Sequence, residues 1–168
     1  MSAPGLVLMG VTGAGKSTIG AALALELGVP FIDGDSLHPR SSIDKMSAGI
    51  PLTDEDRAPW LDIVGELLAK ADKGVVVACS ALRRAYRERI SAHAHNATFI
   101  HLTIPDTELE RRLAARAGHF MPASLLTSQL ETLEPLGPDE NGFAVDGGSD
   151  PAEVVAAIKE RLGDVDRG

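Results

Sequence analysis

The sequence predicts an α/β fold, a five-stranded parallel sheet flanked by helices, and three observations indicate it. Apolar runs of strand length alternate with stretches of helical periodicity along the 168 residues. Residues 75–79 (VVVAC) are apolar without alternation, as expected for a strand buried on both faces of a sheet. The first apolar run, residues 5–9, leads into a glycine-rich turn and then a helical pattern, an order typical of α/β domains.

Each element can be assigned from its local pattern. In the helical segments, apolar residues recur three or four positions apart, as Leu61, Val64 and Leu68 do. Strands are expected at residues 5–9, 29–32, 75–79, 98–102 and 143–145. Helices are expected at residues 17–27, 61–70, 82–93, 106–117, 124–133 and 151–162.

Two polar segments, residues 33–59 and 118–142, fit this alternation poorly and are rich in Gly, Pro, His and Arg. Long segments of this kind in a compact domain tend to be lids or binding loops. Because no repeat or linker interrupts the pattern, residues 1–168 are predicted to form one domain.

Composition excludes several classes of function. With 16 Lys and Arg against 24 Asp and Glu, the formal net charge is −8, so a general nucleic-acid-binding surface is not expected. No apolar run approaches the roughly 20 residues that span a bilayer, and the N-terminus lacks the pattern of a signal peptide. The single cysteine, Cys79, cannot form an internal disulfide, which fits a reducing compartment. We therefore expect a cytoplasmic protein without membrane contact.

The arginines are unevenly distributed, with one cluster at residues 83–89 and another at 111–116. Paired carboxylates on a helix face would explain Arg87, Glu88 and Arg89. The alternative explanation of such clusters is local recognition of a phosphate or a carboxylate.

Residues 10–17 read G-V-T-G-A-G-K-S, the G-x-x-x-x-G-K-S pattern of a phosphate-binding loop. Glycines let successive backbone N–H groups point at one anion, and the following helix presents its positive end to the same anion. Lys16 adds a charge that can follow the β- and γ-phosphates, and Ser17 offers a hydroxyl to Mg²⁺. The expected ATP-binding residues are Gly10, Val11, Thr12, Gly13, Ala14, Gly15, Lys16, Ser17 and Thr18.

The loop alone does not choose between a kinase, a GTPase and a motor. A GTPase would need an Asn-Lys-x-Asp motif, which the sequence lacks, and a motor or large ATPase would need a longer chain. A small-molecule P-loop kinase is therefore the leading prediction, with Lys16 as a catalytic residue.

The second expected strand ends in Asp33-Gly34-Asp35. In a parallel sheet the carboxyl ends of the strands face the ligand, so both carboxylates are expected near the γ-phosphate. We assign Asp35 to the proton or the orientation of the acceptor hydroxyl, and Asp33, with Ser17, to Mg²⁺. The alternative is an ordinary turn, because Asp-Gly is a common turn pair.

The sequence beyond this point resembles the gluconate kinase family along residues 5–158. The similarity is carried by D-G-D-S-L-H-P-R-S-S-I-D-K-M at 33–46 and by G-I-P-L-T-D-E-D-R-A-P-W-L at 49–61. Further matches are A-C-S-A-L-R-R-A-Y-R at 78–87, R-A-G-H-F-M-P at 116–122, L-L-T-S-Q-L at 125–130 and L-E-P-L at 133–136. One departure is Ser42, where the family pattern has Asn.

The resemblance implies a fold similar to shikimate and nucleoside monophosphate kinases. It also implies a homodimer that uses ATP and Mg²⁺ to phosphorylate the 6-hydroxyl of D-gluconate. Such a substrate needs cations for its carboxylate and polar groups along its chain, and we favour Arg57 and Arg83 for the carboxylate. His38 and His119 could instead bond loop carbonyls. The expected substrate-binding residues, within an acceptor segment at 33–61 and beyond it, are Asp35, His38, Arg40, Lys45, Arg57, Arg83, His119 and Gln129.

Residues 112–124 lie where related kinases carry a mobile lid. There Arg116 is expected to be catalytic by neutralising charge that develops on the phosphates, and Arg112 to bind the nucleotide, either over the phosphates or stacked on adenine. Trp60 and Cys79 are expected to be packing residues. Two alternatives stay open: another small-metabolite kinase of the shikimate type, and a nucleotide-dependent binding module that phosphorylates no acceptor.

Overall fold

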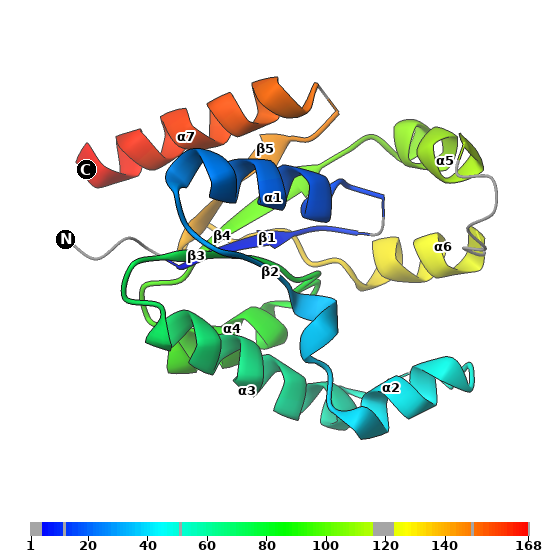
Figure 1. Cartoon of the computed structure of the whole chain (residues 1–168). Helices are drawn as coiled ribbons and strands as arrows, with labels where there is room; N and C mark the ends of the chain where they lie inside the picture. The colour runs from blue at the N-terminus through cyan, green and yellow to red at the C-terminus, as the bar shows by residue number, and fades with distance from the viewer. Residues whose placement is uncertain (1–4, 12, 51, 116–122, 149, 168) are drawn as a thin grey trace.

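The computed structural model describes residues 5–11, 13–50, 52–115, 123–148 and 150–167. Its centre is a sheet of five parallel strands in the order β2-β3-β1-β4-β5, which confirms the predicted sheet (Figure 1). The strands are β1 (Gly5–Met9), β2 (Phe31–Asp33), β3 (Val75–Ala78), β4 (Thr98–Thr103) and β5 (Gly142–Asp146).

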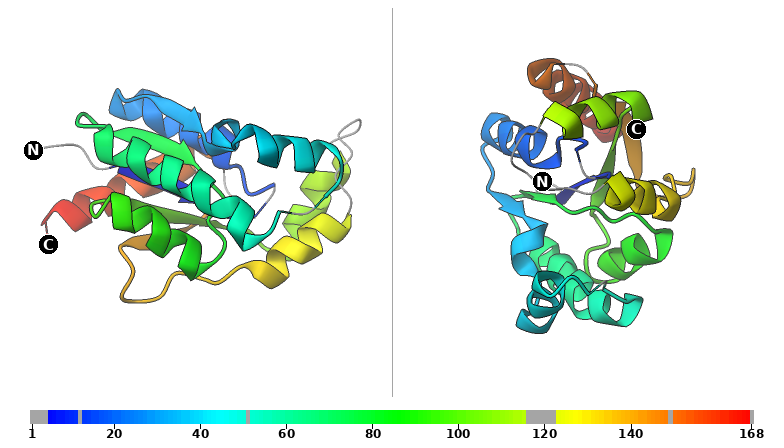
Figure 2. Two further views of the ribbon diagram at one scale, coloured as in Figure 1. Left: turned by 90° about the horizontal axis from the view of Figure 1, so that it is seen from below. Right: turned by 90° about the vertical axis from the view of Figure 1, so that its right-hand side faces the viewer.

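Helices cover both faces of the sheet. In Figure 1, α1 and α7 lie above it and α3 and α4 lie below it. The other three, α2, α5 and α6, project past the carboxyl ends of the strands, as the views in Figure 2 also show. The helices are α1 (Lys16–Leu27), α2 (Arg40–Ser47), α3 (Asp54–Lys70), α4 (Arg84–His93), α5 (Asp106–Ala115), α6 (Ala123–Thr132) and α7 (Pro151–Arg167). None of the helices in the described ranges is long and apolar enough to cross a membrane.

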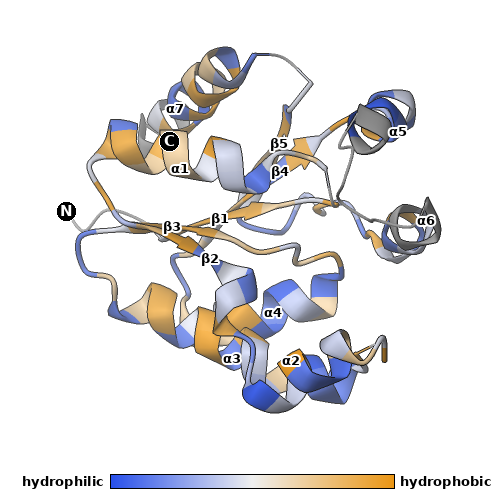
Figure 3. Ribbon diagram, turned by 45° about the vertical axis from the view of Figure 1, so that its right-hand side comes forward, coloured by the Kyte–Doolittle hydropathy of each residue, from blue (hydrophilic) through white to orange (hydrophobic). Residues whose placement is uncertain are grey.

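The core forms two apolar layers, one on each face of the sheet. Along β1, Val7 and Met9 pack with α3 and α4, whereas Leu6 and Leu8 pack with α1 and α7. This division follows from the strand period of two, which sends successive side chains to opposite faces. Figure 3 shows the hydrophobic residues gathered on the strands between the helical layers. Strands buried on both faces make a rigid platform for the residues at their carboxyl ends.

The acceptor segment, residues 33–61, is more ordered than the sequence predicted. A 3₁₀ helix (Gly34–Leu37) and α2 follow β2, and α3 begins at Asp54 rather than at Leu61. Thr53 caps α3 through a capping box with Asp56: its hydroxyl accepts from the Asp56 N–H at 3.1 Å, and the Asp56 carboxylate accepts from the Thr53 N–H at 2.9 Å. Pro59 lies within the helix and removes one of its hydrogen bonds without ending it.

The second strand was also misplaced, since it begins at Phe31 rather than at Val29. The reason is the end of α1. Gly28 adopts a left-handed conformation (φ 69°), and the Val29 N–H donates to the Ala24 carbonyl. Val29 therefore completes the C-terminal cap of the helix and is not available to the sheet.

Candidate active site

The phosphate loop joins β1 to α1. Three of its glycines have positive φ angles, 148° at Gly10, 88° at Gly13 and 94° at Gly15, which L-residues with a Cβ rarely adopt. A Cβ on Gly10 would also lie 3.1 Å from the Leu102 carbonyl oxygen. The loop can therefore curl in this way only because glycine stands at these positions.

Lys16, the first residue of α1, folds back over this loop. Its Nζ donates to the Gly10 and Val11 carbonyls at 2.8 and 3.1 Å. Burial lowers the pKa of Lys16, while the nearby Asp35, Cys79 and Asp33 raise it. The ammonium therefore lies within the electrostatic field of Asp33, the last residue of β2, and of Asp35 just after it.

Those two carboxylates are held by a tight approach of the chain to β3. Asp33 ends β2, and its Oδ1 accepts from the Asp35 N–H at 3.0 Å, which caps the short 3₁₀ helix. A Cβ on Gly34, between them, would lie 2.4 Å from the Ala78 carbonyl oxygen. Only glycine permits that approach, so Gly34 sets the position of both carboxylates. The Asp35 side chain is left exposed beside the loop.

His38 stacks on Trp60, with ring centroids 4.2 Å apart and ring planes inclined by 17°. Trp60 is almost fully buried, so its predicted role as a packing residue is confirmed, and its Nε1 donates to the Gly34 carbonyl at 2.8 Å. Burial lowers the pKa of His38 and Arg57 lowers it further, while Asp35 raises it. The His38 Nδ1 is buried without a hydrogen-bond partner among the described residues.

Arg57, in the first turns of α3, is held by groups that the sequence analysis did not single out. Its Nη1 donates to the Tyr86 hydroxyl at 3.2 Å and lies 3.7 Å from the Asp54 carboxylate, and the guanidinium lies over the Tyr86 ring. The Tyr86 hydroxyl in turn donates to Asp54 at 2.6 Å. No local pattern could have revealed this arrangement, because Tyr86 comes from α4, 29 residues along the chain from Arg57.

The other predicted substrate cations are distributed differently. Arg83 lies at the N-cap of α4, close enough to Tyr86 for its charge to offset part of the rise that burial causes in the pKa of that hydroxyl. No described residue forms a hydrogen bond or ion pair with the Arg83 side chain. Lys45 is paired with Asp56 at 2.8 Å and so ties α2 to α3. Arg40 is 89% exposed and pairs with Asp44 one turn further along α2. Arg57 and Arg83 are thus the predicted cations that this structure brings together.

On the nucleotide side, Arg112 lies against the phosphate loop. Its Nη1 donates to the Gly13 carbonyl at 3.0 Å, and its Nη2 donates to the Gly147 carbonyl at 3.2 Å. Arg112 therefore connects α5 to both the phosphate loop and the turn after β5. Ser17 and Thr18 are exposed in the first turn of α1, and Gln129 is half-buried on α6. Thr12, Arg116 and His119 lie outside the described residues, as does much of the predicted lid.

The donor set expected for Mg²⁺ consists of hard oxygen atoms, which suit this ion. Ser17 contributes a hydroxyl, and one oxygen of Asp33 already accepts a backbone hydrogen bond, while no described residue donates to its other oxygen. Within the described ranges, no three His, Cys, Asp or Glu side chains gather closely enough to hold a metal. The residues therefore fit an ion that takes most of its ligands from nucleotide phosphates and water, as Mg²⁺ commonly does.

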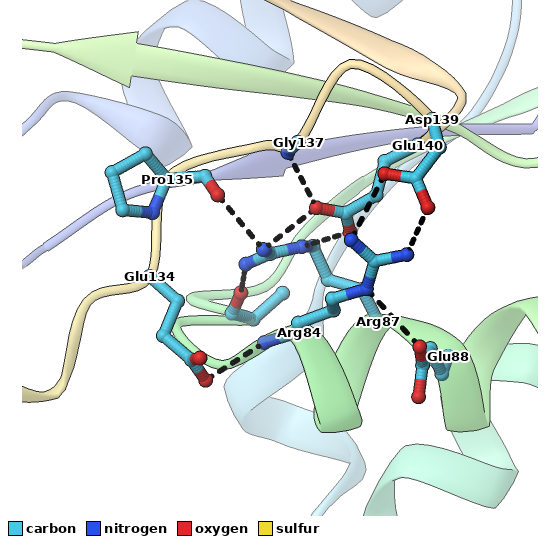
Figure 4. Close-up of polar contacts among 9 residues, drawn as sticks. Arg84, Arg87, Glu88, Glu134, Pro135, Gly137, Asp139 and Glu140 are labelled. Atoms are coloured by element: carbon cyan, nitrogen blue, oxygen red, sulfur yellow. Dashed lines mark hydrogen bonds and ion pairs between the residues drawn. The ribbon is translucent and has the colours of Figure 1, made fainter.

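The expected pairing of Arg87, Glu88 and Arg89 along one helix face was wrong. Glu88 pairs with Arg84, Arg89 pairs with Asp62 of α3, and Arg87 pairs with a carboxylate outside α4. Arg87 is 1% exposed and binds Glu140, 53 residues away (Figure 4). Its carboxylate partner comes from the loop before β5, which helix periodicity could not reveal. Cys79 is the packing residue that was expected, since burial raises the pKa of its thiol to about 12.

A parallel sheet, a glycine loop before α1, a lysine over that loop and two carboxylates at the end of the next strand define a P-loop kinase. Comparisons with known proteins narrow this class. The family model described as shikimate kinase matches residues 12–161. A gluconokinase of Gluconobacter oxydans is 49% identical over 156 residues, which cover 91% of this chain and 88% of the relative.

Solved structures give the same result. A gluconokinase from Sinorhizobium meliloti superimposes with a TM-score of 0.83 at 46% identity and covers 95% of both chains. A sugar kinase from a Janibacter species, solved without ligand, superimposes with a TM-score of 0.86 at 42% identity, covering 95% of this chain and 94% of that one. The chain therefore belongs to the gluconokinase family of P-loop kinases.

Proposed function

We propose that this chain transfers the γ-phosphoryl group of ATP to the 6-hydroxyl of D-gluconate, giving 6-phospho-D-gluconate and ADP. The observation that carries the proposal is the position of Asp35 between Lys16 of the phosphate loop and His38 of the acceptor segment. Its charge raises the pKa of Lys16 on the nucleotide side and of His38 on the other side. Phosphoryl transfer requires the donor and the acceptor hydroxyl to come together, and a carboxylate that acts on both Lys16 and His38 lies at that meeting point. The 49% identity to a named gluconokinase supports gluconate as that acceptor.

On the donor side, the loop's backbone N–H groups and the N-terminus of α1 would bind the phosphates. Lys16 would exchange its bonds to Gly10 and Val11 for bonds to the β- and γ-phosphates and neutralise charge during transfer. We assign Arg112 to the nucleotide because it already bridges the Gly13 and Gly147 carbonyls. Arg116 remains a proposal from the sequence, as a cation over the transferring group.

On the acceptor side, we assign Asp35 to the 6-hydroxyl. The hydroxyl oxygen forms the new bond to phosphorus as the bond from phosphorus to the ADP oxygen breaks, and the hydroxyl proton passes to Asp35. The carboxylate of gluconate would bind at the opposite end of the acceptor site, to Arg57 and Arg83. His38, neutral and stacked on Trp60, can form a hydrogen bond with a substrate hydroxyl through Nδ1, which has no partner among the described residues.

Magnesium completes this proposal. Ser17 and Asp33 are the residues that would hold it together with the nucleotide phosphates. Bound there, it would reduce the negative charge of the phosphates that the nucleophile must approach. The residues of the chain supply the positioning, and the ion supplies the additional positive charge.

The test is a coupled assay for ADP release with ATP and a panel of acceptors: D-gluconate, other sugar acids, neutral polyols and shikimate. Gluconate should give the highest kcat/KM, and the product should carry phosphate on carbon 6 by ³¹P–¹H NMR. Equal turnover of several sugar acids, or turnover of shikimate alone, would disprove gluconate specificity. ATP binding without transfer to any acceptor would instead indicate a nucleotide-dependent binding module.

The family resemblance also leads us to propose a cytoplasmic homodimer that binds neither nucleic acid nor membrane. The acidic net charge of −8 supports the absence of a nucleic-acid partner. Sedimentation of the purified protein with and without ATP would establish the assembly state, and fractionation of cells that produce it would establish the compartment.

A further inference from the structure

The loop at residues 80–83, between β3 and α4, has a strained backbone. Ala81 has a φ of 43°, and it is the one non-glycine residue with a positive φ in the described ranges. A residue with a Cβ adopts this left-handed conformation at a cost in energy, so other contacts must hold it. The loop lies at the carboxyl edge of the sheet and leads directly into Arg83, one of the proposed ligands of the gluconate carboxylate.

Three successive carbonyls of this loop are bonded to three different parts of the molecule. The Ser80 carbonyl accepts from the N–H of Gly10, the first residue of the phosphate loop, at 3.3 Å. The Ala81 carbonyl accepts from Nη1 of Arg87 at 2.9 Å. The Leu82 carbonyl accepts from the Glu134 N–H at 2.7 Å. The strained residue is therefore the one that is held by a buried arginine.

Arg87 is itself held rigidly. Its Nε and Nη2 donate to the two carboxylate oxygens of Glu140 at 2.7 and 3.0 Å, and Nη2 also reaches the Pro135 carbonyl at 3.4 Å (Figure 4). Glu140 accepts a further bond from the Gly137 N–H at 2.8 Å. With the two side chains 1% and 9% exposed, the pair carries a large cost of desolvation. Hydrophobic residues could fill this space at less cost, but they could not hold a carbonyl in a fixed direction.

We propose that Arg87, oriented by Glu140, is a positioning residue for the acceptor site. It holds Ala81 in its left-handed conformation and thereby fixes where Arg83 leaves the loop and meets the carboxylate of the substrate. The inference rests on the proposed gluconate kinase function, because that function supplies the substrate carboxylate that Arg83 would bind. Arg87 touches neither substrate nor nucleotide in this account and acts only through the loop backbone.

The test uses Arg87→Lys, which keeps a positive charge beside Glu140 but lacks the planar fork needed to bond Ala81 at the same time. We expect the KM for gluconate to rise about tenfold, the effect of one well-placed hydrogen bond, with kcat and the KM for ATP changed less than about twofold. Arg89→Lys is the matched control. Arg89 lies on the same helix and forms a bidentate pair, but it is exposed and its partner is Asp62 of α3 and not the loop. Its kinetics should not change.

The decisive measurement is rescue by Ala81→Gly. Glycine adopts positive φ without the cost that alanine carries, so the loop should need less help from Arg87. The double variant Ala81→Gly with Arg87→Lys should recover most of the lost gluconate affinity, whereas Ala81→Gly alone should resemble the unmodified enzyme. A merely structural role of Arg87 predicts no such rescue.

Should Arg87→Lys fail to fold, Glu140→Asp replaces it, because the shorter carboxylate draws the guanidinium away from Ala81 while keeping the charges paired. It should raise the KM for gluconate in the same direction, again with rescue by Ala81→Gly. An unchanged KM for gluconate in both variants, or equal loss of gluconate and ATP affinity without rescue, would overturn the proposal. Failure of the proposed function is distinguishable, since the unmodified enzyme would then show no gluconate turnover at all.

Discussion

The nucleotide side and the acceptor side of the candidate active site use different parts of the chain, backbone groups on one side and side chains on the other. The nucleotide side consists mainly of backbone, with three glycines at positive φ and a lysine bonded to the carbonyls of its own loop. The acceptor side consists of side chains that hold other side chains, such as Trp60 beneath His38 and Tyr86 against Arg57. A backbone site depends on a few residues close together in sequence. A side-chain site depends on contacts between segments that are far apart in sequence. Substitutions there should each reduce activity separately, and by smaller factors than substitutions in the phosphate loop.

The strongest test of this contrast is Lys16→Ala. It removes the mobile charge from the nucleotide side, and kcat/KM should fall by on the order of 10³ or more, as when a phosphate-bound cation is lost from a phosphoryl-transfer site. Because Lys16 is buried at a cost that lowers its pKa, the variant should unfold at the same temperature or a higher one. The assay is single-turnover phosphoryl transfer together with thermal unfolding. Lys159→Ala, which removes an exposed pair with Glu26, is the control.

Asp35→Asn should separate the two halves. The amide keeps the shape of the side chain but cannot take the hydroxyl proton, so kcat should fall by about 10² to 10⁴ while ATP affinity changes little. Calorimetric titration with a non-hydrolysable ATP analogue would measure the affinity, and the coupled assay would measure kcat. A large loss of ATP affinity with kcat retained would assign Asp35 to the nucleotide side. Asp44→Asn, on the exposed face of α2, serves as the control.

Arg57→Met should affect the acceptor alone. Loss of one charge-assisted contact should raise the KM for gluconate by about 10- to 100-fold. The variant should also reduce the ratio of kcat/KM for gluconate to kcat/KM for its neutral analogue sorbitol. Sorbitol has no carboxylate, so loss of Arg57 should affect it much less. Steady-state kinetics with both acceptors would measure this ratio. If both acceptors weakened equally, Arg57 would be holding the segment and not the carboxylate.

Tyr86→Phe is the milder form of the same test. It removes the hydroxyl that joins Arg57 to Asp54 but keeps the aromatic ring beneath the guanidinium. We expect a rise of about two- to fivefold in the KM for gluconate, because the hydroxyl acts on the substrate only through Arg57, and Arg57 still lies close to Asp54. The pH dependence of kcat should stay the same, because Tyr86 has no part in proton transfer. A shifted pH profile would contradict that separation.

The smallest expected effect concerns His38. Its pKa is lowered, so the ring stays neutral at neutral pH and takes a proton only below the ordinary range of about 6.5. The unfolded chain would take that proton at higher pH, and this residue therefore reduces stability as the pH falls below about 6.5. Titration of the His38 Cε1–H by NMR should give a midpoint below the ordinary value, and His38→Asn should remove this contribution. A midpoint above 6.5 would show that Asp35 outweighs burial.

The contrast between the two halves also explains what could be predicted from sequence. The phosphate loop and the parallel sheet were predictable because glycine spacing and unbroken apolar strands are local signals. The Arg57, Tyr86 and Asp54 arrangement was not, since its partners lie 29 and 32 residues apart. Arg87 was assigned to the wrong kind of pair for the same reason, because its carboxylate comes from another segment. The starts of α3 and β2 were errors that local signals could have corrected. Thr53 and Asp56 indicate a capped helix start, and Gly28 indicates a helix C-terminal cap that includes Val29.

The contacts of Lys16 in the free enzyme affect what a measured nucleotide affinity represents. In the free enzyme the Lys16 ammonium is not waiting in water, because it is already bonded to two carbonyls of its own loop. An arriving nucleotide exchanges those bonds for its own, so the affinity measures the difference between two occupied states. A triphosphate can replace both carbonyl contacts of Lys16, whereas a single phosphate ion provides fewer oxygen atoms to replace them. The free loop thus already discriminates among anions before any lid or acceptor takes part.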